Sequence, residues 1–301
     1  MKSPLPPRNN ISPSYLWLPE GNWNTLLDFL AERFSHIDRS VWVYRLEQDG
    51  IMDEQGVCYR PDSPYVGGVR LFYYRQVDDE AEVPFKEKIL YHDDHLIAVD
   101  KPHFLAVAPA GRYLHQTLLV RLKKRFDMEH ITPMHRIDRE TAGVILFSKN
   151  AETRGKYQVM FQERNMHKTY EAVAPFLDNL KFPYTHRSRM VKSSPFFCMK
   201  EVEGEVNSET LINILEVQGD LAKYQLQPVT GKQHQLRVHL SSLGAPIVND
   251  QFYPKVLSER AADDFKDPLQ LLAKSIAFVD PISGEERYFE SEQKLHLCDA
   301  M

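Results

Sequence analysis

Charged side chains are concentrated in one short stretch, His135–Glu140, which has the sequence H-R-I-D-R-E. Four of these six residues are charged and a fifth is a histidine. The apolar run Val144–Phe147 follows and predicts a buried strand, because it is short and begins with β-branched residues. Asp138 is therefore expected on a loop that a rigid strand holds in place, where catalytic groups are often found. An ordinary turn with a local Arg–Asp pair explains the same pattern equally well.

Two arginines could act on the carboxylate of Asp138. Arg136 is two residues away, and Arg237 lies on an expected helix after the turn Thr230-Gly231-Lys232. A carboxylate between guanidinium groups stays ionised well below its ordinary pKa of about 3.9. An ionised aspartate can act as a nucleophile or as an electrostatic stabiliser. The glycosidic bond of a nucleoside is one target for such a group.

Other catalytic patterns are weak. The sequence has no Walker loop, no dinucleotide-binding glycine motif and no nucleophile elbow. His234 and His239 are five residues apart, which is poor spacing for metal ligands on one helix, so no metal site is expected. Cys58, Cys198 and Cys298 are odd in number and widely spaced, which favours reduced thiols in the cytoplasm.

Basic residues are unevenly distributed along the chain. The formal net charge is −5, yet residues 101–175 carry 13 basic and 7 acidic side chains. This local excess fits phosphate binding at one site. A solvated helix face gives the same pattern, for example at the basic positions within Arg121–Arg125. No run of about 18 apolar residues occurs, so no membrane span is expected.

Three parts are expected along the chain. Residues 1–22 are rich in proline and asparagine and predict a loosely ordered arm. Residues 23–78 predict a small module, which the acidic stretch Asp78–Glu82 links to a larger domain of residues 83–301. The larger domain mixes helices and strands without a regular βαβ alternation. Its predicted class is α+β, with a largely antiparallel mixed sheet flanked by helices.

Several elements of the larger domain follow from periodicity, whereas residues 176–206 contain few regular signals and are expected to be irregular. The expected helices are Gln116–Phe126, Glu152–Arg164 and His234–Leu243. The expected strands are Leu96–Val99, Val144–Phe147, Lys168–Ala174, Thr210–Val217, Leu221–Pro228, Leu271–Val279 and Glu286–Phe289.

The stretch H-R-I-D-R-E-T-A-G-V-I-L-F-S-K from His135 resembles the signature loop and strand of the RluA family of pseudouridine synthases. Three further blocks follow in the family's order, namely Asp93–Val107, His167–Ala174 and Val229–Asp250. The resemblance covers roughly residues 85–290. It implies the pseudouridine synthase fold and the isomerisation of uridine to pseudouridine in RNA, with no cofactor and no metal.

The resemblance also implies roles for single residues. Asp138 is the nucleophile or its equivalent, Tyr170 stacks on the uracil and helps remove the proton from carbon 5, and Arg237 pairs with Asp138. The uridine must be flipped out, since a stacked base shields its glycosidic bond. Arg136 fills the space that the uridine leaves. Further RNA contacts are expected from His135, Arg139, Lys168, Lys232 and His234.

The segment Thr25–Tyr74 weakly resembles the ribosomal-protein-type RNA-binding module that some family members carry in front of the catalytic domain. It is acidic where that module is basic, and it lacks an Arg/Lys-rich helix. Two roles are therefore open for this module: it binds RNA, or it has a structural or protein-contact role. Ala142 and Lys232 replace the family's usual Ser and Arg without touching the proposed chemistry.

The leading hypothesis is an RNA pseudouridine synthase that acts as a cytoplasmic monomer. Large-subunit ribosomal RNA is the expected substrate, by analogy with members that have a front module, and transfer RNA is the alternative. A non-catalytic RNA-binding protein on the same scaffold is a competing hypothesis. Another is a nucleoside or glycoside hydrolase, which needs a second acid such as Glu140. The sequence leaves open whether Asp138 attacks the base, attacks the sugar or abstracts a sugar proton.

Overall fold

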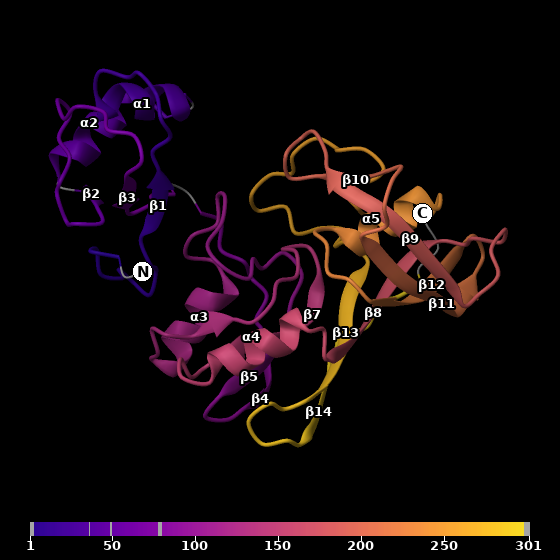
Figure 1. Ribbon diagram of the computed structural model, residues 1–301. Helices are drawn as coiled ribbons and strands as arrows, with labels where there is room; N and C mark the ends of the chain where they lie inside the picture. Colours follow the sequence, from indigo (N-terminus) through magenta and orange to yellow (C-terminus); the bar gives the residue numbers. More distant parts are fainter. Residues whose placement is uncertain (1–2, 36, 49, 78–79, 298–301) are drawn as a thin grey trace. The chain divides into compact units, whose positions relative to one another are not determined.

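The computed structural model describes residues 3–35, 37–48, 50–77 and 80–297. The chain divides into two compact units, Met1–Asp79 and Glu80–Met301 (Figure 1). Asp78 and Asp79 of the expected linker lie outside the described residues, and so does Cys298. Within the described ranges, no helix combines the length and the apolar character needed to cross a membrane.

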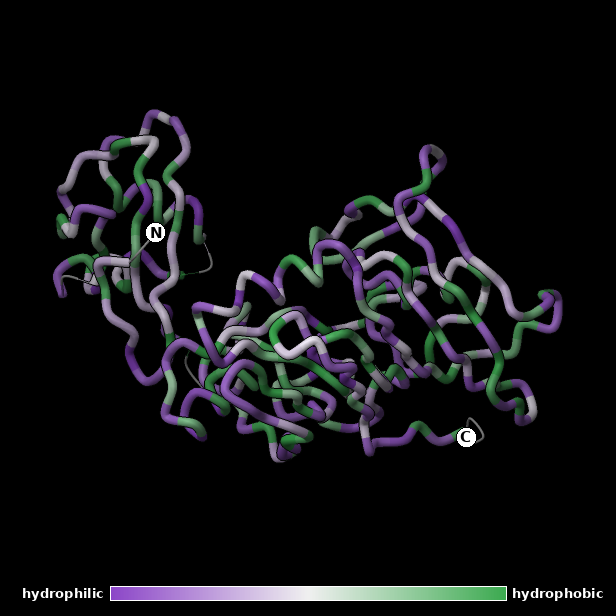
Figure 2. Tube along the Cα trace, turned by 60° about the horizontal axis from the view of Figure 1, so that its bottom comes forward, coloured by the Kyte–Doolittle hydropathy of each residue, from purple (hydrophilic) through white to green (hydrophobic). Residues whose placement is uncertain are grey.

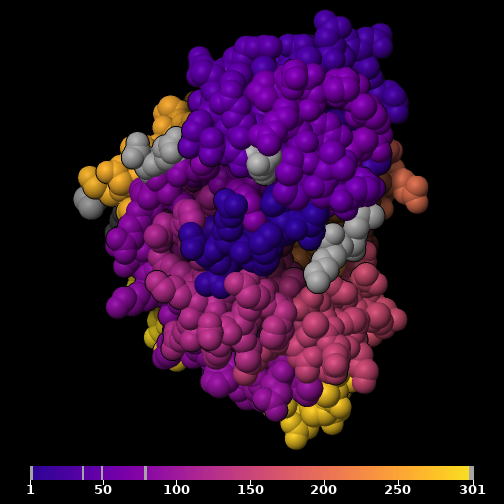
Figure 3. All heavy atoms as spheres, turned by 90° about the vertical axis from the view of Figure 1, so that its left-hand side faces the viewer, coloured from indigo at the N-terminus to yellow at the C-terminus, as the bar shows by residue number. Residues whose placement is uncertain are grey.

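The smaller unit packs two helices against a three-stranded antiparallel sheet, and its surface is drawn in indigo and purple in Figure 3. The strands are β1 (Ser14–Trp17), β2 (Ile51–Asp53) and β3 (Arg70–Tyr73), in the order β1-β3-β2, and the helices are α1 (Leu26–Arg33) and α2 (Arg39–Glu47). Thr25 caps α1, because its side chain accepts from the backbone N–H of Asp28 at 3.2 Å.

The prediction of a loosely ordered arm over residues 1–22 is wrong for much of that segment. Ser14–Trp17 pairs with β3, and the side chains of Leu5, Ile11 and Leu18 are buried. These apolar residues are covered by partners that are distant in the sequence, which the local proline-rich composition does not reveal.

One 11-stranded sheet is the frame of the larger unit. Its main path has the order β10-β9-β11-β12-β8-β13-β7-β5-β4, while β14 pairs with β13 and β6 pairs with β7. Among the described strands only β13 and β7 pair in parallel, so the predicted α+β class with a largely antiparallel mixed sheet is confirmed. The strands are β4 (Lys88–His92), β5 (Leu96–Lys101), β6 (Thr132–Pro133), β7 (Ala142–Ser148), β8 (Met166–Pro175), β9 (Tyr184–Lys192), β10 (Met199–Val202), β11 (Ser208–Gln218), β12 (Leu221–Pro228), β13 (Leu271–Val279) and β14 (Glu286–Glu290).

Three helices cover this sheet: α3 (Leu118–Phe126), α4 (Arg154–Gln162) and α5 (Gln235–Ser242). Side chains alternate across a strand, so β5 sends Ile97 into the cluster with Leu122 of α3 and Ala98 into the cluster with Tyr157 of α4. Helices α3 and α4 therefore cover opposite faces of β5 and β7. Helix α5 packs on β11 and β12 through Leu236 and Leu240. The hydrophobic stretches follow these interior segments, and the loops are mostly hydrophilic (Figure 2).

The prediction that residues 176–206 are irregular is wrong, because this segment contains β9 and β10. Strand β9 buries only Met190 fully and alternates between half-buried and exposed residues. An antiparallel strand with one solvated face needs few apolar residues, so the sequence T-H-R-S-R-M-V-K hides its strand character.

Candidate active site

A cavity of about 570 Å³ lies where the loop before β7, the middle of β8 and the turn before α5 meet. Its volume is within the usual range for small-ligand sites, about 300–1,000 Å³. Most of the residues singled out in the sequence line it, although they come from three separate segments: Arg136, Asp138, Lys168, Tyr170, Lys232 and Arg237.

The loop that carries Asp138 is fixed at both ends. Strands β6 and β7 pair with each other, so the chain leaves and returns at the same place, and the Thr141 N–H donates to the Asp138 carbonyl at 3.2 Å. Gly143 has φ of +106°, and a Cβ there would lie 2.2 Å from the Ala273 carbonyl oxygen. Only glycine therefore allows β7 to pair with β13 at this point. Lys101 holds the next turn, because its buried Nζ donates to the Arg139 carbonyl at 3.0 Å.

Asp138 is paired with Arg237, as the sequence predicted. Arg237 Nη1 donates to Asp138 Oδ2 at 3.1 Å, and the Arg237 side chain is almost completely buried. Asp138 keeps 30% of its side-chain surface exposed, which is the part that faces the cavity. A fixed cation on one side and an open space on the other leave one carboxylate oxygen accessible to a ligand.

Asp250 holds Arg237 from the other side. Arg237 Nε and Nη2 donate to the two Asp250 oxygens at 2.8 and 2.6 Å, a bidentate pair with strong orientation. The backbone N–H groups of Phe252 and Tyr253 also donate to Asp250 Oδ1, at 2.8 and 3.1 Å. The guanidinium of Arg237 therefore has one direction left, toward Asp138.

The charges around Asp138 keep it ionised. Burial alone would raise the pKa of Asp138, but neighbouring His234 and Arg237 outweigh this and lower it below its ordinary value. Burial also lowers the pKa of His234, whose Nε2 lies 3.7 Å from Asp138 Oδ1, so this histidine is neutral near pH 7. At neutral pH the stabilising charge therefore comes mainly from Arg237.

Tyr170 is on β8 and lines the cavity together with Asp138. In the sheet its backbone lies between Leu226 of β12 and Ala273 of β13. Burial, together with the negative charge of Asp138, raises the pKa of its phenol well above the ordinary value. The phenol is therefore protonated at all moderate pH values.

Comparison with known proteins shows which family has a sequence like that of this chain. Residues 95–242 match a family described as RNA pseudouridylate synthase. An uncharacterized RNA pseudouridine synthase of Synechocystis sp. is 30% identical over 238 residues, which cover 76% of this chain and 79% of that protein. The dual-specificity RNA pseudouridine synthase RluA of Vibrio vulnificus is 32% identical over 211 residues, covering 65% of this chain and 79% of RluA.

This chain belongs to the RluA family of RNA pseudouridine synthases. The fold agrees, since the structure of human RNA Pseudouridylate Synthase Domain Containing 1 matches with a TM-score of 0.56 at 24% identity, over 69% of this chain and 84% of that one. The pseudouridine synthase fold that the motifs predicted is thereby confirmed, and the protein is an RNA pseudouridine synthase enzyme.

The residues expected to contact RNA in this synthase fall into two groups. Arg136, Lys168, Lys232 and His234 line the cavity, and Arg136 and Lys232 are exposed there. Arg139 does not line it: its guanidinium lies over the rings of Tyr113 and Phe104, at 4.7 and 5.5 Å, and pairs with Glu140.

His135 lines the cavity but is held by the protein. Its Nε2 accepts the Leu146 N–H at 3.1 Å, and its ring stacks on Phe161 at 5.0 Å. The arrangement supports the loop rather than offering Nε2 to a phosphate. Glu140, the second acid that a hydrolase would need, pairs with Arg139 and does not line the cavity.

The basic residues of α3 and α4 are also partly engaged within the protein. Arg121 donates to the carbonyls of Phe85 and Val83, at 2.6 and 2.8 Å, and Lys123 is buried near Glu129. Arg154 donates to the His130 carbonyl. This geometry favours structural roles for these three side chains over contact with RNA.

Sequence reasoning missed Asp250, Lys101 and Tyr253 as parts of the site. Asp250 follows Arg237 by 13 residues in a loop without periodicity, so no local pattern connects them. The hydroxyl of Tyr253 contacts His234 Nδ1 at 2.8 Å, which fixes the histidine ring beside Asp138. Nothing local in the sequence shows that the ammonium of Lys101 is buried under the loop that carries Asp138.

One group of side chains among the described residues has metal-like proximity, namely His186, Glu201 and His239, whose ligand atoms lie within 4.8 Å of one another. His186 Nε2 contacts Glu201 at 2.9 Å, and the His239 nitrogens contact Thr210 and Ser208 hydroxyls at 2.9 and 3.1 Å. These hydrogen bonds connect β9, β10 and β11 with α5. They account for the cluster as a support of the helix that carries Arg237.

Proposed function

We propose that this enzyme isomerises a specific uridine of a structured RNA, with Asp138 acting on a flipped-out nucleotide in the cavity. The substrate that we favour is large-subunit ribosomal RNA, and transfer RNA is the alternative. One observation carries the proposal: a carboxylate kept ionised by Arg237 faces an open cavity next to a tyrosine ring. Relatives in the RluA family include a dual-specificity enzyme, which is consistent with either class of RNA.

The reaction makes particular demands on such a site. The bond between N1 of uracil and C1′ of ribose breaks, the base turns, carbon 5 bonds to C1′ and loses its proton, and N1 gains a proton. No atom is gained or lost overall, so no cofactor or co-substrate is required. Asp138 can serve as the nucleophile that holds one fragment or as the base that removes a sugar proton, and both uses need the ionised form.

Tyr170 is proposed to stack on the uracil. Its backbone pairs with β12 and β13 and its side chain packs against the hydrophobic core, which limits its motion and favours a defined position for the base. The raised pKa of its phenol argues against the expected removal of the carbon 5 proton by Tyr170 itself. We therefore assign it the positioning of the base rather than the proton transfer.

Arg136 is proposed to occupy the space that the flipped uridine leaves in the RNA. It is exposed at the mouth of the cavity, two residues from Asp138, and a guanidinium can stack between bases. Lys168, Lys232 and His234 would then face the phosphates and the sugar around the target nucleotide.

The test is incubation of the purified full chain with ribosomal and transfer RNA transcripts labelled with tritium at carbon 5 of uridine. Release of tritium together with pseudouridine in ribosomal RNA supports the proposal, and pseudouridine only in transfer RNA selects the alternative substrate. Free uracil would identify a hydrolase. RNA binding without any new product would identify a non-catalytic protein, and either outcome overturns the mechanism.

A further inference from the structure

The turn between β9 and β10, residues 193–198, exposes a phenylalanine. Two backbone hydrogen bonds close this turn, from Ser193 N–H to the Cys198 carbonyl at 2.9 Å and from Cys198 N–H to the Pro195 carbonyl at 2.8 Å. The Phe196 side chain is 83% exposed, the largest value for a large hydrophobic residue in the described part of the chain. An aromatic ring on an ordered turn costs hydration free energy that a polar residue would avoid.

Phe196 is not an isolated surface residue, since it begins a row of rings that leads to the cavity. The ring centroids of Phe196 and Phe197 are 5.5 Å apart, Phe197 and Phe252 are 5.1 Å apart, and Phe252 lies 5.7 Å from His234. His234 contacts Asp138 at the cavity wall. We call Phe196, Phe197 and Phe252 the aromatic strip.

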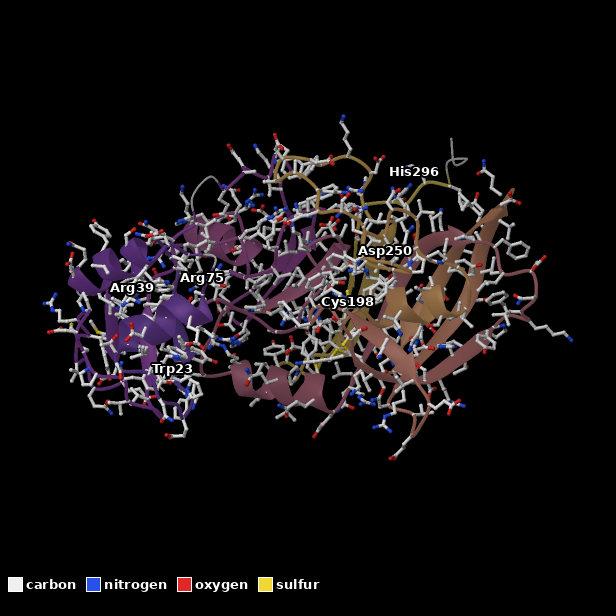
Figure 4. All side chains as sticks on the ribbon, turned by 90° about the horizontal axis from the view of Figure 1, so that it is seen from above. Trp23, Arg39, Arg75, Cys198, Asp250 and His296 are labelled. Atoms are coloured by element: carbon white, nitrogen blue, oxygen red, sulfur yellow. The ribbon has the colours of Figure 1, made fainter. Side chains whose placement is uncertain are left out.

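The strip has a fixed position relative to the catalytic residues. Gln233, which lines the cavity, donates from Nε2 to the Phe197 carbonyl at 3.1 Å. Cys198 and Asp250 are labelled in Figure 4 and lie near each other, one directly after Phe197 and the other two residues before Phe252. The hairpin turn is therefore attached to the same loop that holds Arg237.

Two exposed lysines lie in the chain segments next to the strip, Lys192 before the turn and Lys232 beside Gln233. Lys232 is exposed and lines the cavity next to Gln233. Lys192 is exposed at the end of β9 and faces the same side of the hairpin as Met190, which packs with Tyr253 and Phe252. Exposed rings between basic side chains are the arrangement by which proteins hold single-stranded nucleic acid, with phosphates on the cations and bases on the rings.

We propose that the aromatic strip stacks on an unpaired base of the RNA substrate close to the target uridine, with Phe196 as the ring in contact. This inference rests on the proposed function, because it needs RNA lying across the cavity. A flipped uridine deprives its neighbours of a stacking partner. Arg136 fills the gap itself, whereas Phe196, outside the cavity, stacks on an unpaired base further along the strand, stabilises the open RNA and selects target sites that are followed or preceded by unpaired nucleotides.

The test uses the full chain and a stem-loop transcript that the wild-type enzyme modifies, with affinity measured by fluorescence anisotropy. Phe196→Ala is expected to weaken binding by roughly 5- to 150-fold, the range for losing one stacked base. Phe196→Trp is expected to restore the affinity for RNA. For both variants the single-turnover rate at saturating RNA is expected to stay within about 2-fold of wild type. Phe176→Ala is the matched control, because Phe176 is also exposed but is not part of the aromatic strip.

A second measurement places the contact on the RNA. 2-Aminopurine is introduced at each unpaired position of the loop, and its fluorescence is expected to be quenched by wild-type protein at one position and not by Phe196→Ala. Unchanged affinity of Phe196→Ala, or quenching that does not depend on residue 196, overturns the inference. Absence of pseudouridine from every transcript with wild-type protein would instead count against the proposed function.

Discussion

At the scale of single residues, the site is a buried guanidinium shared by two carboxylates. Arg237 contacts Asp138 through one nitrogen and Asp250 through the other two. A buried charge pair is costly to desolvate, and one strongly oriented arginine serves two acids here. Asp250 thus orients the arginine, and the arginine in turn keeps Asp138 ionised and aimed at the cavity.

Asp138→Asn tests the reacting group. The amide keeps the shape of the side chain but cannot act as nucleophile or base, so pseudouridine formation is expected to vanish. RNA affinity is expected to remain, since it depends mainly on phosphate contacts. The free energy of unfolding is expected to change little, because Arg237 keeps its pair with Asp250. Turnover near the wild-type rate with a lower melting temperature would show that Asp138 is only a structural residue.

Asp250→Asn tests the orienting residue. The amide has no negative charge and only one acceptor oxygen, so it cannot replace the bidentate ion pair with Arg237. The free energy of unfolding is therefore expected to fall by about 3 kcal/mol. The turnover number is expected to fall at least about 10-fold while RNA affinity stays unchanged, because Arg237 no longer points firmly at Asp138. Urea unfolding and single-turnover assays measure the two effects. Exposed Asp178→Asn is the control, and equal behaviour of both variants would refute this role.

At the scale of elements, the cations at the cavity differ from those on the helices. Lys168 on β8 and Lys232 before α5 line the cavity, whereas Arg121 of α3 donates to backbone carbonyls of the protein. The charge excess of residues 101–175 therefore does not by itself mark the RNA path. The positions of the side chains relative to the cavity decide which of them can meet phosphates.

Salt dependence separates the two sets. A double variant Lys168→Gln, Lys232→Gln is expected to weaken RNA binding and to reduce the slope of log affinity against log salt concentration by about 2, one unit per lost phosphate contact. The control variant Lys124→Gln, Arg125→Gln removes two exposed charges of α3 and is expected to leave the slope unchanged. The opposite result would assign the RNA path to α3.

At the scale of the whole molecule, the start of the larger unit is attached to its core. The Glu80 carboxylate accepts the backbone N–H groups of Leu114, His115 and Gln116, at 2.7, 2.7 and 2.8 Å. A chain that begins at residue 80 is expected to fold and to modify a short stem-loop. A chain that begins at Val83 lacks these bonds and is expected to melt at a lower temperature in thermal unfolding. Identical melting of both chains would show that Glu80 contributes nothing.

Buried and half-buried histidines predict how the stability of the molecule depends on pH. Burial lowers the pKa of His135 to about 3 and the pKa values of His103 and His239 to about 4. As pH falls from about 6.5 toward 4, the unfolded chain takes up protons at these positions and the folded chain does not, so the free energy of unfolding decreases. The slope is at most about 1.4 kcal/mol per pH unit for each histidine.

Urea unfolding at pH 7.5, 6 and 5 measures this loss. His135→Gln is expected to reduce the slope, since it removes one group whose pKa is lowered in the folded chain. A free energy of unfolding that is flat between pH 7.5 and 5 would contradict the assignment of these histidines as buried and neutral.

The sequence by itself determined the family's motifs, the α+β class and most elements around the candidate site. Strands such as Val144–Phe147 can be predicted locally, because a short apolar run is stable only when it is buried. The motifs around Asp138, Tyr170 and Arg237 can also be predicted, because each of them is a continuous stretch of sequence. The strands within residues 176–206 escaped detection because their solvated faces require few apolar residues.

Only the tertiary structure decided which charges act together. Asp250 reaches Arg237 across a loop, Lys101 reaches the loop of Asp138 from another strand, and Arg139 turns toward Tyr113 instead of the cavity. These contacts depend on the register of β7 against β5 and β13 and on the path of loops without periodicity. Side-chain direction, burial and pairing are properties of that packing, so no local pattern in the sequence contains them.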